Sequence, residues 1–396
     1  MGNKDFLETL LKSKPDQFSS ILNNRDSLRV QIIYTQINRD SKNRPSFTDY
    51  TFNLHNQYFY PASTVKMPIA FLALEKLNEL NIAGVNKYTT MITDSAASRQ
   101  DIVYTNPQAI DSRPTIADYI KQIFLVSDND AFNRLYEFLG QGTIQKKLLE
   151  KGYTDAVIRH RLQINLSDEQ NRATNPVSFY DTSGKLLYWQ QAQYNTNTFP
   201  TFDVKLGKGY MEGNKLVQEP FDFSSKNKLS LQYLHDIEKS VLFPESVTKK
   251  QRFHLSEDDR NFLLHWMSAF PRESGYPSYD SATYADTYCK FLLWGSEKGI
   301  NKPDYIRIFN KVGDAYGFVT DVAYIVDFKN KVEFMLSATI SCNSDGIYND
   351  DRYDYETVGY PFMKQLGQLL YDYELKRPKK HNAVLDNLAA LRVTNK

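Results

Sequence analysis

Cysteine and histidine are scarce in this chain of 396 residues, and both shortages exclude classes of protein. Two cysteines, Cys289 and Cys342, are too few for a disulfide scaffold or a thiolate metal cluster, and they leave open either one bridge or two buried thiols. The six histidines are scattered, and no pair has the spacing of a helical zinc site. We therefore expect no metal and no other cofactor.

An excess of charge and a long apolar run are also missing. Lys and Arg number 48 against 47 Asp and Glu, so no electrostatic footprint for nucleic acid or anionic lipid is present. The longest apolar run, Met67 to Leu74, is far shorter than the ~20 residues of a membrane helix. The first residues also lack the apolar core of a signal peptide, so we expect either a cytosolic protein or one whose export signal has been removed.

What the sequence does contain is typical of a folded globular protein with a large core. Apolar residues make up 41%, charged residues 24% and aromatic residues 14% of the chain. Periodic spacing of apolar residues predicts strands at 28–37, near 50–54, and at 305–312, 319–327 and 332–340. The helical period predicts helices within 4–24 and at 63–80, 115–126, 129–139, 229–242, 256–269 and 356–375.

The order of these elements predicts an α+β protein, with an antiparallel sheet flanked by helices and an inserted helical lobe. Strands from both ends of the chain would form the α/β lobe, residues 28–62 and 300–376. Residues 63–299 would form the mostly helical lobe, and both lobes would make one catalytic unit, 1–396. A functional site is expected in the cleft between the lobes.

The helical lobe contains an insertion at 177–228, which we interpret as irregular or β-rich because its helical periodicity fades. Its aromatic residues could offer a stacking platform for sugar or peptide, but we favour ordinary packing of the insertion onto the helical lobe. These residues are Tyr180, Tyr188, Trp189, Tyr194 and Tyr210. The basic stretch 376–380 near the end of the chain is interpreted as a frayed tail.

The first element that can carry chemistry is Ser63-Thr64-Val65-Lys66. An extended segment becomes a helix at Ser63, so its hydroxyl would lie at a helix N-terminus, where unpaired N–H groups favour negative charge. Lys66 lies one turn later on the same face. A desolvated lysine amine near other cations loses its proton easily and can accept the serine proton.

The second and third elements are Ser127-Asp128-Asn129 and Lys311-Val312-Gly313. Ser127 joins two apolar helical runs, where a hydroxyl can relay a proton, and Asp128 is expected to cap the second helix. Asn129 supplies an amide for a substrate carbonyl or for Lys66, and Lys311 supplies a cation near the end of a strand.

Gly313 allows the backbone to approach a ligand closely. The N–H groups of Asp314 and Ser63 would then form an oxyanion hole. Taken singly, these patterns are weak, because Ser-x-x-Lys recurs at Ser225 and Ser246. Neither of those serines opens an apolar helix, and Ser-Asp-Asn occurs once, so order and context favour the set that begins at Ser63.

The ordered triplet resembles the serine β-lactamase and penicillin-binding-protein superfamily, in particular its class A-like branch. The segment Ala173 to Pro176 is similar to the end of that branch's Ω-loop. The resemblance implies that Ser63 is the acylated nucleophile, Lys66 its activator and Ser127 the proton shuttle. It implies a substrate-binding role for Asn129 and a cationic anchor at Lys311, with Gly313 and Asp314 beside the substrate.

The same resemblance implies a monomer acting outside the cytoplasm, periplasmic or secreted, on a small-molecule or cell-wall peptide substrate. Departures from the pattern argue against an efficient β-lactamase. The stretch 161–171 has no Glu-x-x-Leu-Asn to activate the deacylating water, and Asp168 or Glu169 would have to replace it. Val312 removes a hydroxyl that helps to bind a carboxylate, and Asp314 would repel an anionic substrate.

Three hypotheses follow. The first is a serine hydrolase that forms an acyl-enzyme on Ser63 with an amide or ester and has weak β-lactamase activity. The second is a peptidase or transpeptidase like the penicillin-binding proteins. The third is a non-catalytic binding protein that keeps the cleft, which a structure with Lys66 pointing away from Ser63 would favour.

Overall fold

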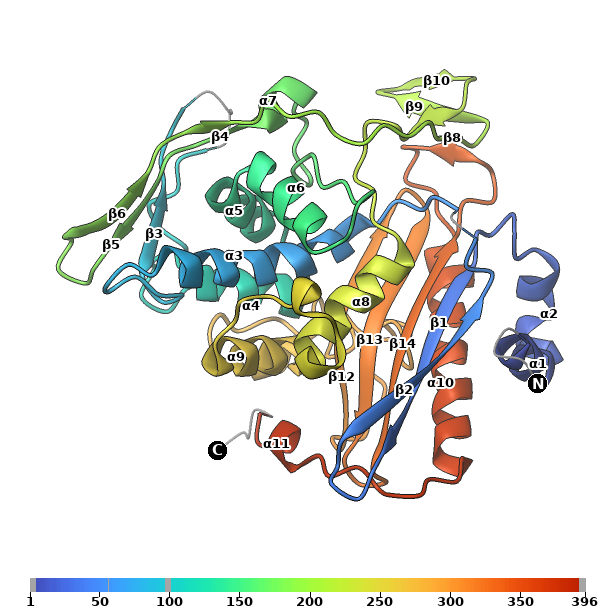
Figure 1. Ribbon diagram of the computed structural model, residues 1–396. Coiled ribbons are helices and arrows are strands. Elements are labelled where there is room, and N and C mark those ends of the chain that lie inside the picture. The colour runs from blue at the N-terminus through green and yellow to red at the C-terminus, as the bar shows by residue number, and fades with distance from the viewer. Residues whose placement is uncertain (1–4, 56, 97–100, 392–396) are drawn as a thin grey trace.

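A computed structural model describes residues 5–55, 57–96 and 101–391, and a five-stranded antiparallel sheet lies at its centre (Figure 1). Its order is β12-β13-β14-β1-β2, so strands from both ends of the chain pair side by side. Ile32 in β1 lies opposite Ala338 in β14. The strands are β1 (Gln31–Arg39), β2 (Pro45–Phe52), β12 (Ile306–Ala315), β13 (Phe318–Asp327) and β14 (Val332–Ser341).

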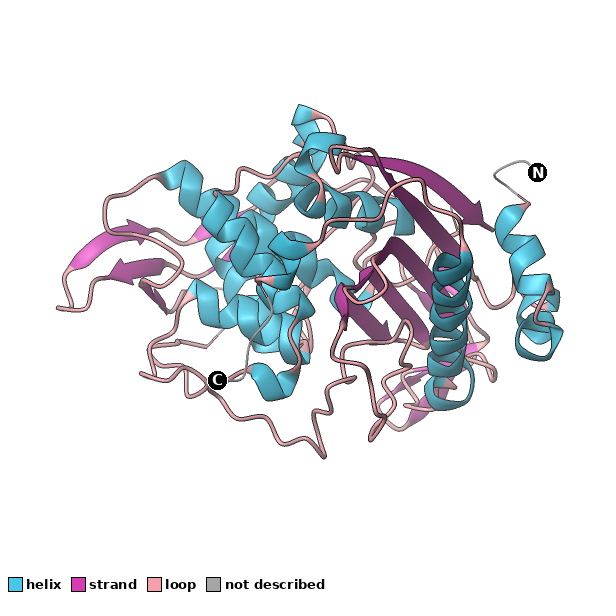
Figure 2. Ribbon diagram, turned by 90° about the horizontal axis from the view of Figure 1, so that it is seen from below, coloured by secondary structure: helices cyan, strands magenta, loops and turns pink. Residues whose placement is uncertain are grey.

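Side chains that alternate along the central strands fill two separate cores. In β1, Ile32 and Tyr34 belong to the core that contains α10 (Tyr360–Lys376), whereas Ile33 belongs to the core that contains α8 (Leu231–Leu242). Because successive side chains of a strand point to opposite faces, the buried strands need cover on both sides. Figure 2 shows helices on both sides of the sheet. The α+β class with an antiparallel sheet flanked by helices is therefore as predicted.

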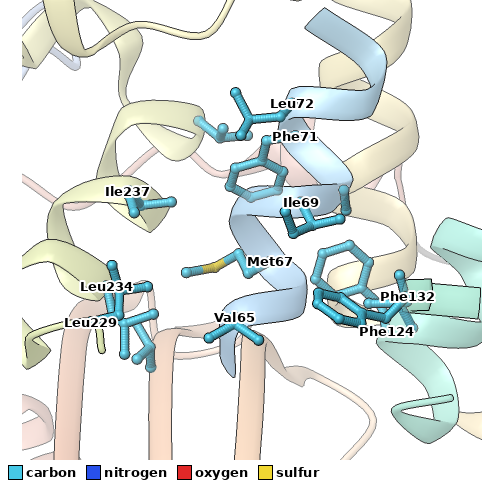
Figure 3. Packing of buried hydrophobic residues seen from close by; sticks show 14 of the residues in the cluster. Val65, Met67, Ile69, Phe71, Leu72, Phe124, Phe132, Leu229, Leu234 and Ile237 are labelled. Atoms are coloured by element: carbon cyan, nitrogen blue, oxygen red, sulfur yellow. The ribbon is translucent and has the colours of Figure 1, made fainter. Parts of the chain in front are cut away.

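The helical lobe is built around α3 (Lys66–Leu80), whose apolar residues run around the whole helix. Such a helix is stable only when it is buried on all sides. The side chains of α3 meet α4, α5 and α8 in one core (Figure 3). The other helices of this lobe are α4 (Ile116–Val126), α5 (Asn129–Leu139), α6 (Gln141–Glu150), α7 (Asp168–Arg172) and α9 (Glu257–Ser268).

The insertion at 177–228 is a series of short strands, as its composition indicated. The β5–β6 hairpin of the insertion pairs with β3 (Thr90–Thr93), and its β7 pairs with β4 (Ala173–Thr174). Its β9 pairs with β15 (Ile347–Tyr348), which follows the central sheet. The strands of the insertion are β5 (Val177–Tyr180), β6 (Leu186–Gln190), β7 (Gln193–Tyr194), β8 (Lys205–Leu206), β9 (Gly209–Glu212), β10 (Lys215–Val217) and β11 (Phe221–Asp222).

Several helices differ from the sequence predictions. The helical segment predicted within 4–24 is two helices, α1 (Phe6–Lys12) and α2 (Pro15–Asn23). The sequence analysis missed α6, α7 and the short α11 (Asp386–Ala389). The remaining turns are single helical turns at Ala62–Val65, Pro244–Ser246, Lys249–Gln251 and Pro271–Glu273 and a π turn at Tyr355–Gly359.

The prediction of a frayed tail at 376–380 was wrong, because two of its basic residues contact a buried carboxylate. Arg377 Nη2 lies 3.0 Å from Glu374 Oε2, and Lys379 Nζ lies 3.3 Å from the same atom. Glu374 is fully buried, so its charge needs these partners. Cys289 and Cys342 are both buried free thiols. In the described part of the chain, no helix is long and apolar enough to cross a membrane.

The buried His235 joins α8 to the sheet and generates a prediction about stability. Its Nε2 lies 2.8 Å from Thr35 Oγ1, and its Nδ1 lies 2.8 Å from Ser337 Oγ. Burial lowers the pKa of His235 to about 4, against an ordinary value near 6.5, although the nearby Asp49 opposes this and Lys239 adds to it.

Between pH 6.5 and pH 4 the unfolded chain therefore binds a proton at His235 that the folded chain does not. The free energy of unfolding should fall over this range, with about 3 kcal/mol lost through this residue. We expect His235→Asn to remove that part of the pH dependence, as measured by urea unfolding at pH 7 and pH 4. An equal loss in wild type and variant would contradict this account.

Candidate active site

The backbone around Ser63 is held by close contact with β12. Ala62, directly before Ser63, has φ +47°, a left-handed backbone conformation that residues other than glycine rarely adopt. A Cβ on Gly313 would lie 2.8 Å from Pro61 O and 2.8 Å from Ser63 N. Glycine is therefore required at 313 so that the strand can lie directly against the Ser63 turn.

Lys66 lies at the centre of the polar groups. Its Nζ is 2.9 Å from Ser63 Oγ, 2.7 Å from Asn129 Oδ1 and 2.5 Å from the backbone oxygen of Ser127. The residue is fully buried. The short helical turn at Ala62–Val65 and the first turn of α3 put Ser63 and Lys66 on one side, as the three-residue spacing predicted.

Ser127 lies between two lysines. It ends α4 in a left-handed conformation with φ +58°, and its Oγ is 2.8 Å from Lys311 Nζ and 3.3 Å from Lys66 Nζ. Asp128 caps α5 as expected, since its Oδ1 accepts a hydrogen bond of 2.8 Å from the N–H of Ala131. The structure thus brings Ser63, Lys66, Ser127, Asn129 and Lys311 together in one place.

Burial and like charge both act on the two lysines. Burial lowers the pKa of Lys66 well below its ordinary value, and the neighbouring Lys311 lowers it further. Burial also lowers the pKa of Lys311. Because burial and repulsion disfavour two adjacent ammonium groups, Lys66 can lose its proton, and its neutral amine can accept a proton from Ser63.

A cavity of about 560 Å³ opens next to Ser63. Ser63, Asn129 and Asp314, all singled out from the sequence, line it. Gly313 and Lys311 are not among its lining residues. Sequence reasoning missed other residues of its wall, including Tyr60, His160, Gln163, Lys226 and Tyr316. No motif marks these residues, because they come from loops whose approach to the site only the fold determines.

Lys226 is the part of the 177–228 insertion that reaches this cavity. Its Nζ lies 5.6 Å from the ring centres of both Phe221 and Tyr316. Cation–π contact of this kind holds the ammonium group above the rings at the cavity wall. The cavity wall also contains a negative charge, Asp314, which accepts a hydrogen bond of 2.7 Å from the Tyr360 hydroxyl.

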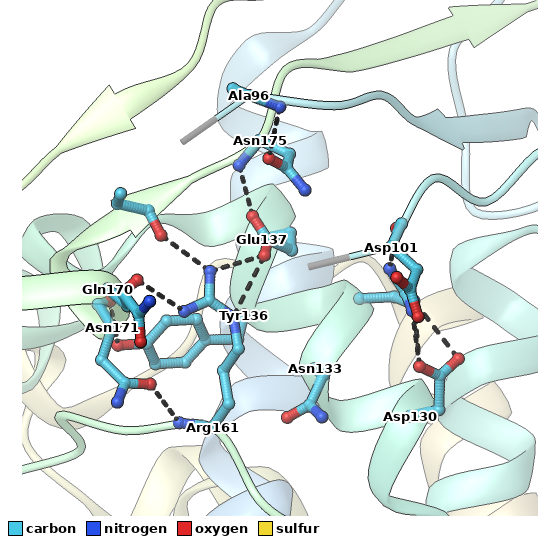
Figure 4. Close-up of polar contacts among 12 residues, drawn as sticks. Ala96, Asp101, Asp130, Asn133, Tyr136, Glu137, Arg161, Gln170, Asn171 and Asn175 are labelled. Atoms are coloured by element: carbon cyan, nitrogen blue, oxygen red, sulfur yellow. Dashed lines mark hydrogen bonds and ion pairs between the residues drawn. The ribbon is translucent and has the colours of Figure 1, made fainter. Parts of the chain in front are cut away.

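The loop of residues 161–175, here called the Arg161 loop, forms one wall of the cavity and is fixed by a buried ion pair (Figure 4). Arg161 Nη2 lies 2.5 Å from Glu137 Oε1, and both side chains are fully buried. Arg161 also donates to the backbone oxygen of Ala173 at 2.8 Å, and Glu137 accepts from the N–H of Asn175. A single charge pair therefore joins both ends of the loop to α5.

Asn133 holds the start of the same loop. Its Nδ2 donates to Leu162 O at 3.0 Å, and its Oδ1 accepts from Leu162 N at 3.0 Å. The next residue, Gln163, has φ +57°, and its Oε1 accepts a hydrogen bond of 2.6 Å from Asn129 Nδ2. A carboxamide, rather than a carboxylate, thus faces Asn129 from the Arg161 loop.

Asp168 and Glu169, the acids considered from the sequence as substitutes for a missing glutamate, do not line the cavity. Asp168 pairs with Arg159 at 2.6 Å, and the Tyr194 hydroxyl donates to Glu169. Both acids belong to α7, beyond the part of the loop that reaches Ser63. Within the described residues, no group of three or more His, Cys, Asp or Glu side chains is placed to hold a metal ion.

Helices around a central antiparallel sheet, with a serine, two lysines and a Ser-Asp-Asn turn at their junction, are the arrangement expected from the resemblance to the serine β-lactamases and penicillin-binding proteins. Residues 16–192 match the model of the β-lactamase enzyme family. This match confirms the resemblance that the motifs indicated. No curated protein matches the chain.

Several solved structures are similar to the chain at low sequence identity. A β-lactamase from Xanthomonas campestris is 13% identical, with a TM-score of 0.49 over 91% of this chain and 98% of that one. A β-lactamase from Sphaerobacter thermophilus is 11% identical, with a TM-score of 0.48 over 92% and 98%. A point mutant of PBP-A, in an acyl-enzyme complex with penicillin G, is 16% identical, with a TM-score of 0.47 over 93% and 96%.

The Arg161–Glu137 pair generates a prediction about stability. Removal of one partner leaves a buried charge without compensation, so Arg161→Ala should lower the free energy of unfolding by about 3–5 kcal/mol. Arg44→Ala is the matched control, because the Arg44–Asp40 pair is exposed, and it should cost less than about 1 kcal/mol. Urea unfolding measures both values, and similar losses in the two variants would contradict the role assigned to burial.

Proposed function

We propose that this chain is a serine hydrolase that forms an acyl-enzyme on Ser63 with an amide or ester substrate. The observation that carries the proposal is the contact of 2.9 Å between Ser63 Oγ and the Nζ of the fully buried Lys66. A serine hydroxyl becomes nucleophilic only when a base accepts its proton, and a neutral lysine amine is such a base.

In the proposed reaction, the neutral amine of Lys66 accepts the Ser63 proton while Oγ attacks the substrate carbonyl carbon. The carbonyl π electrons move to oxygen, and the N–H groups of Ser63 and Asp314 stabilise the oxyanion. When the oxyanion collapses, the bond to the leaving group breaks. Ser127, 3.3 Å from Lys66 Nζ, passes a proton to that group, and Lys66 replaces the proton of Ser127.

Asn129 and Lys311 support this sequence of steps. Asn129 accepts from Lys66 and donates to Gln163, which fixes the direction of its amide beside the cavity. Lys311 donates to Ser127 Oγ at 2.8 Å and keeps a positive charge next to the relay. That charge disfavours protonation of Lys66 and favours loss of the proton from Ser127.

Deacylation is the slow step of the proposal, because no general base is placed to activate water among the described residues of the cavity wall. Asp314 is the one carboxylate among them, and it already accepts from Tyr360. His160 also lines the wall, but both of its ring nitrogens are engaged: Nε2 accepts from the N–H of Asn227 at 3.2 Å, and Nδ1 lies 2.7 Å from Arg161 O. Gln163 contacts Asn129 from the position where a base would act, but a carboxamide cannot accept the proton of water. The acyl-enzyme should therefore persist, and β-lactamase activity should be weak.

A transpeptidase or peptidase like the penicillin-binding proteins is the second candidate, and the same lack of a base in the described cavity wall favours it. An acyl group that reacts slowly with water is available to an amine, which is a better nucleophile. Val312 and Asp314 both disfavour an anionic substrate. The strand offers no hydroxyl at 312 to bind a carboxylate, and the carboxylate at 314 repels anions. The family match supports action outside the cytoplasm, in the periplasm or after secretion.

A non-catalytic binding protein is less well supported. That hypothesis required Lys66 to point away from Ser63, whereas the two side chains are in hydrogen-bond contact. An insertion that blocked the cavity would also favour a binding protein. Of the residues 177–228, Lys226 lines the cavity of about 560 Å³.

The proposal is tested by mass spectrometry of the intact protein after incubation with benzylpenicillin or a reactive ester. Wild type should gain the mass of one acyl group, and Ser63→Ala should gain none. Ser246→Ala is the matched control, since Ser246 also begins a Ser-x-x-Lys pattern but donates to Phe243 O away from the cavity. An adduct that survives in Ser63→Ala would refute the assignment.

The pH dependence of acylation tests the state of Lys66. Only the neutral amine accepts the Ser63 proton, so the acylation rate should fall as the pH drops through the lowered pKa of Lys66. Lys311→Ala removes the neighbouring cation and should raise that pKa, which moves the acidic limb to higher pH whatever the absolute rate. Lys226→Ala removes a cation from the cavity wall and should leave the limb in place; a limb that stays fixed in Lys311→Ala would contradict the model.

Gln163→Glu tests the account of deacylation. A carboxylate at this position can take a proton from water, and general-base catalysis contributes roughly 10²–10⁴-fold. Stopped-flow measurement with a chromogenic β-lactam should show a burst followed by slow turnover in wild type. The variant should show faster steady-state turnover, and Gln163→Asn, the matched neutral variant, should not. No gain in Gln163→Glu would show that the missing base does not limit turnover.

A further inference from the structure

A second cavity lies apart from the Ser63 site, on the other side of the Arg161 loop. It has a volume of about 490 Å³ and lies between the first turns of α6 and the segment 193–198. This volume is within the range of small-molecule binding sites. The Arg161 loop borders both cavities, since its residues 161–165 line the first and Arg172 lines the second.

The walls of this second cavity are preformed. Asn195 Nδ2 donates to Gln141 Oε1 at 2.7 Å, and both side chains are buried. Arg172 Nη1 donates to the backbone oxygens of Asn195 at 3.0 Å and Asn197 at 2.8 Å. Gly142 allows the two walls to approach, because a Cβ there would lie 3.0 Å from Asn195 Oδ1. A ligand would therefore not have to order this segment when it binds.

The lining is rich in groups that both donate and accept hydrogen bonds. Carboxamides and threonine hydroxyls predominate, and no carboxylate is among the described lining residues. Gln145 lines the cavity, and its Nε2 donates to the backbone oxygen of Ala156 at 2.9 Å, so its amide is a fixed part of the wall.

The two cations of the lining are already engaged. The guanidinium of Arg172 is held by backbone oxygens and lies 3.5 Å from Asp168, and Lys146 lies 3.8 Å from Glu150. They leave no concentrated positive charge for a phosphate or another strong anion. An apolar ligand would cover the exposed polar groups of Thr196, Asn197 and Thr198 without bonding to them, so the lining favours an uncharged ligand that carries many hydroxyl groups.

Tyr194 adds an aromatic face to this wall. Its side chain is 51% exposed, and its hydroxyl donates to Glu169, which fixes the ring at the edge of the cavity. A pyranose has hydroxyl groups around its edge and C–H groups on its faces. Amides can bind the edge of such a ring, while an exposed aromatic ring covers its face.

We propose that the cavity between α6 and residues 193–198 is a binding site for a neutral oligosaccharide. The site is independent of the reaction proposed at Ser63, because none of its lining residues lines the Ser63 cavity. In this proposal, Tyr194 stacks on one sugar ring, and accessible polar side chains of the lining, among them Gln193, Thr196 and Asn197, bind its hydroxyl or acetamido groups.

The test is titration of the full chain with N,N′,N″-triacetylchitotriose and with maltotriose, followed by calorimetry and by saturation-transfer NMR. We expect saturable, weak binding of at least one of these sugars. Tyr194→Ala should weaken it about tenfold. Thr196→Val, which removes one exposed hydroxyl from the lining, should weaken it about threefold.

Trp189→Ala is the matched control, because Trp189 is a 56% exposed aromatic residue of the same insertion that does not line the cavity. It should bind the sugar as wild type does, and so should Ser63→Ala, which separates this site from the proposed catalysis. The proposal is overturned if neither sugar binds, or if Tyr194→Ala and Thr196→Val both retain wild-type affinity. It is also overturned if Trp189→Ala loses affinity as Tyr194→Ala does.

Discussion

The chemistry of this fold depends on two lysine amines buried beside one hydroxyl. Lys66 and Lys311 both lie within hydrogen-bond distance of Ser127 Oγ, and burial disfavours the charge of each. Neither side chain reaches solvent, since Lys66 is 0% and Lys311 is 2% exposed. The fold thus holds two ammonium groups closer together than flexible lysines would lie in solution. Loss of the proton from Lys66 would remove the repulsion between them.

That arrangement requires the sheet and α3 to meet almost without side chains between them. At Gly313 the missing Cβ allows β12 to lie against the turn that carries Ser63, and the turn itself accepts a left-handed residue at Ala62. Both features cost conformational freedom or backbone strain, which persists only where the surrounding structure enforces it. The buried residues of α3, which pack against α4, α5 and α8, provide that enforcement.

Local patterns predicted most of the fold and the centre of the site. Apolar periodicity located the five sheet strands and most helices, and the helix start at Ser63 distinguished its Ser-x-x-Lys from two others. Contacts between residues distant in the sequence could not be predicted. From the sequence alone, Glu137 is one more polar residue of α5, and only the fold shows that it pairs with Arg161. Lys226 was missed for the same reason, since it lies in an insertion without periodicity. The tail at 376–380 is held by contacts distant in the sequence, from Arg377 to Asn38 and Ile37, as well as by the buried Glu374.

Gln163 connects these features, because the charge at this position acts on both halves of the proposed reaction. A carboxylate there would help water attack the acyl-enzyme, but it would also lie close to Asn129 and hence to Lys66, and would raise the pKa of that amine. A neutral Gln163 does not oppose the effect of Lys311 on Lys66, which favours attack by Ser63 and leaves the acyl group without a base. In the proposed reaction the site is therefore better arranged to capture an acyl group than to release it to water, and the persistent acyl-enzyme that we propose follows from the same electrostatics that would activate the serine.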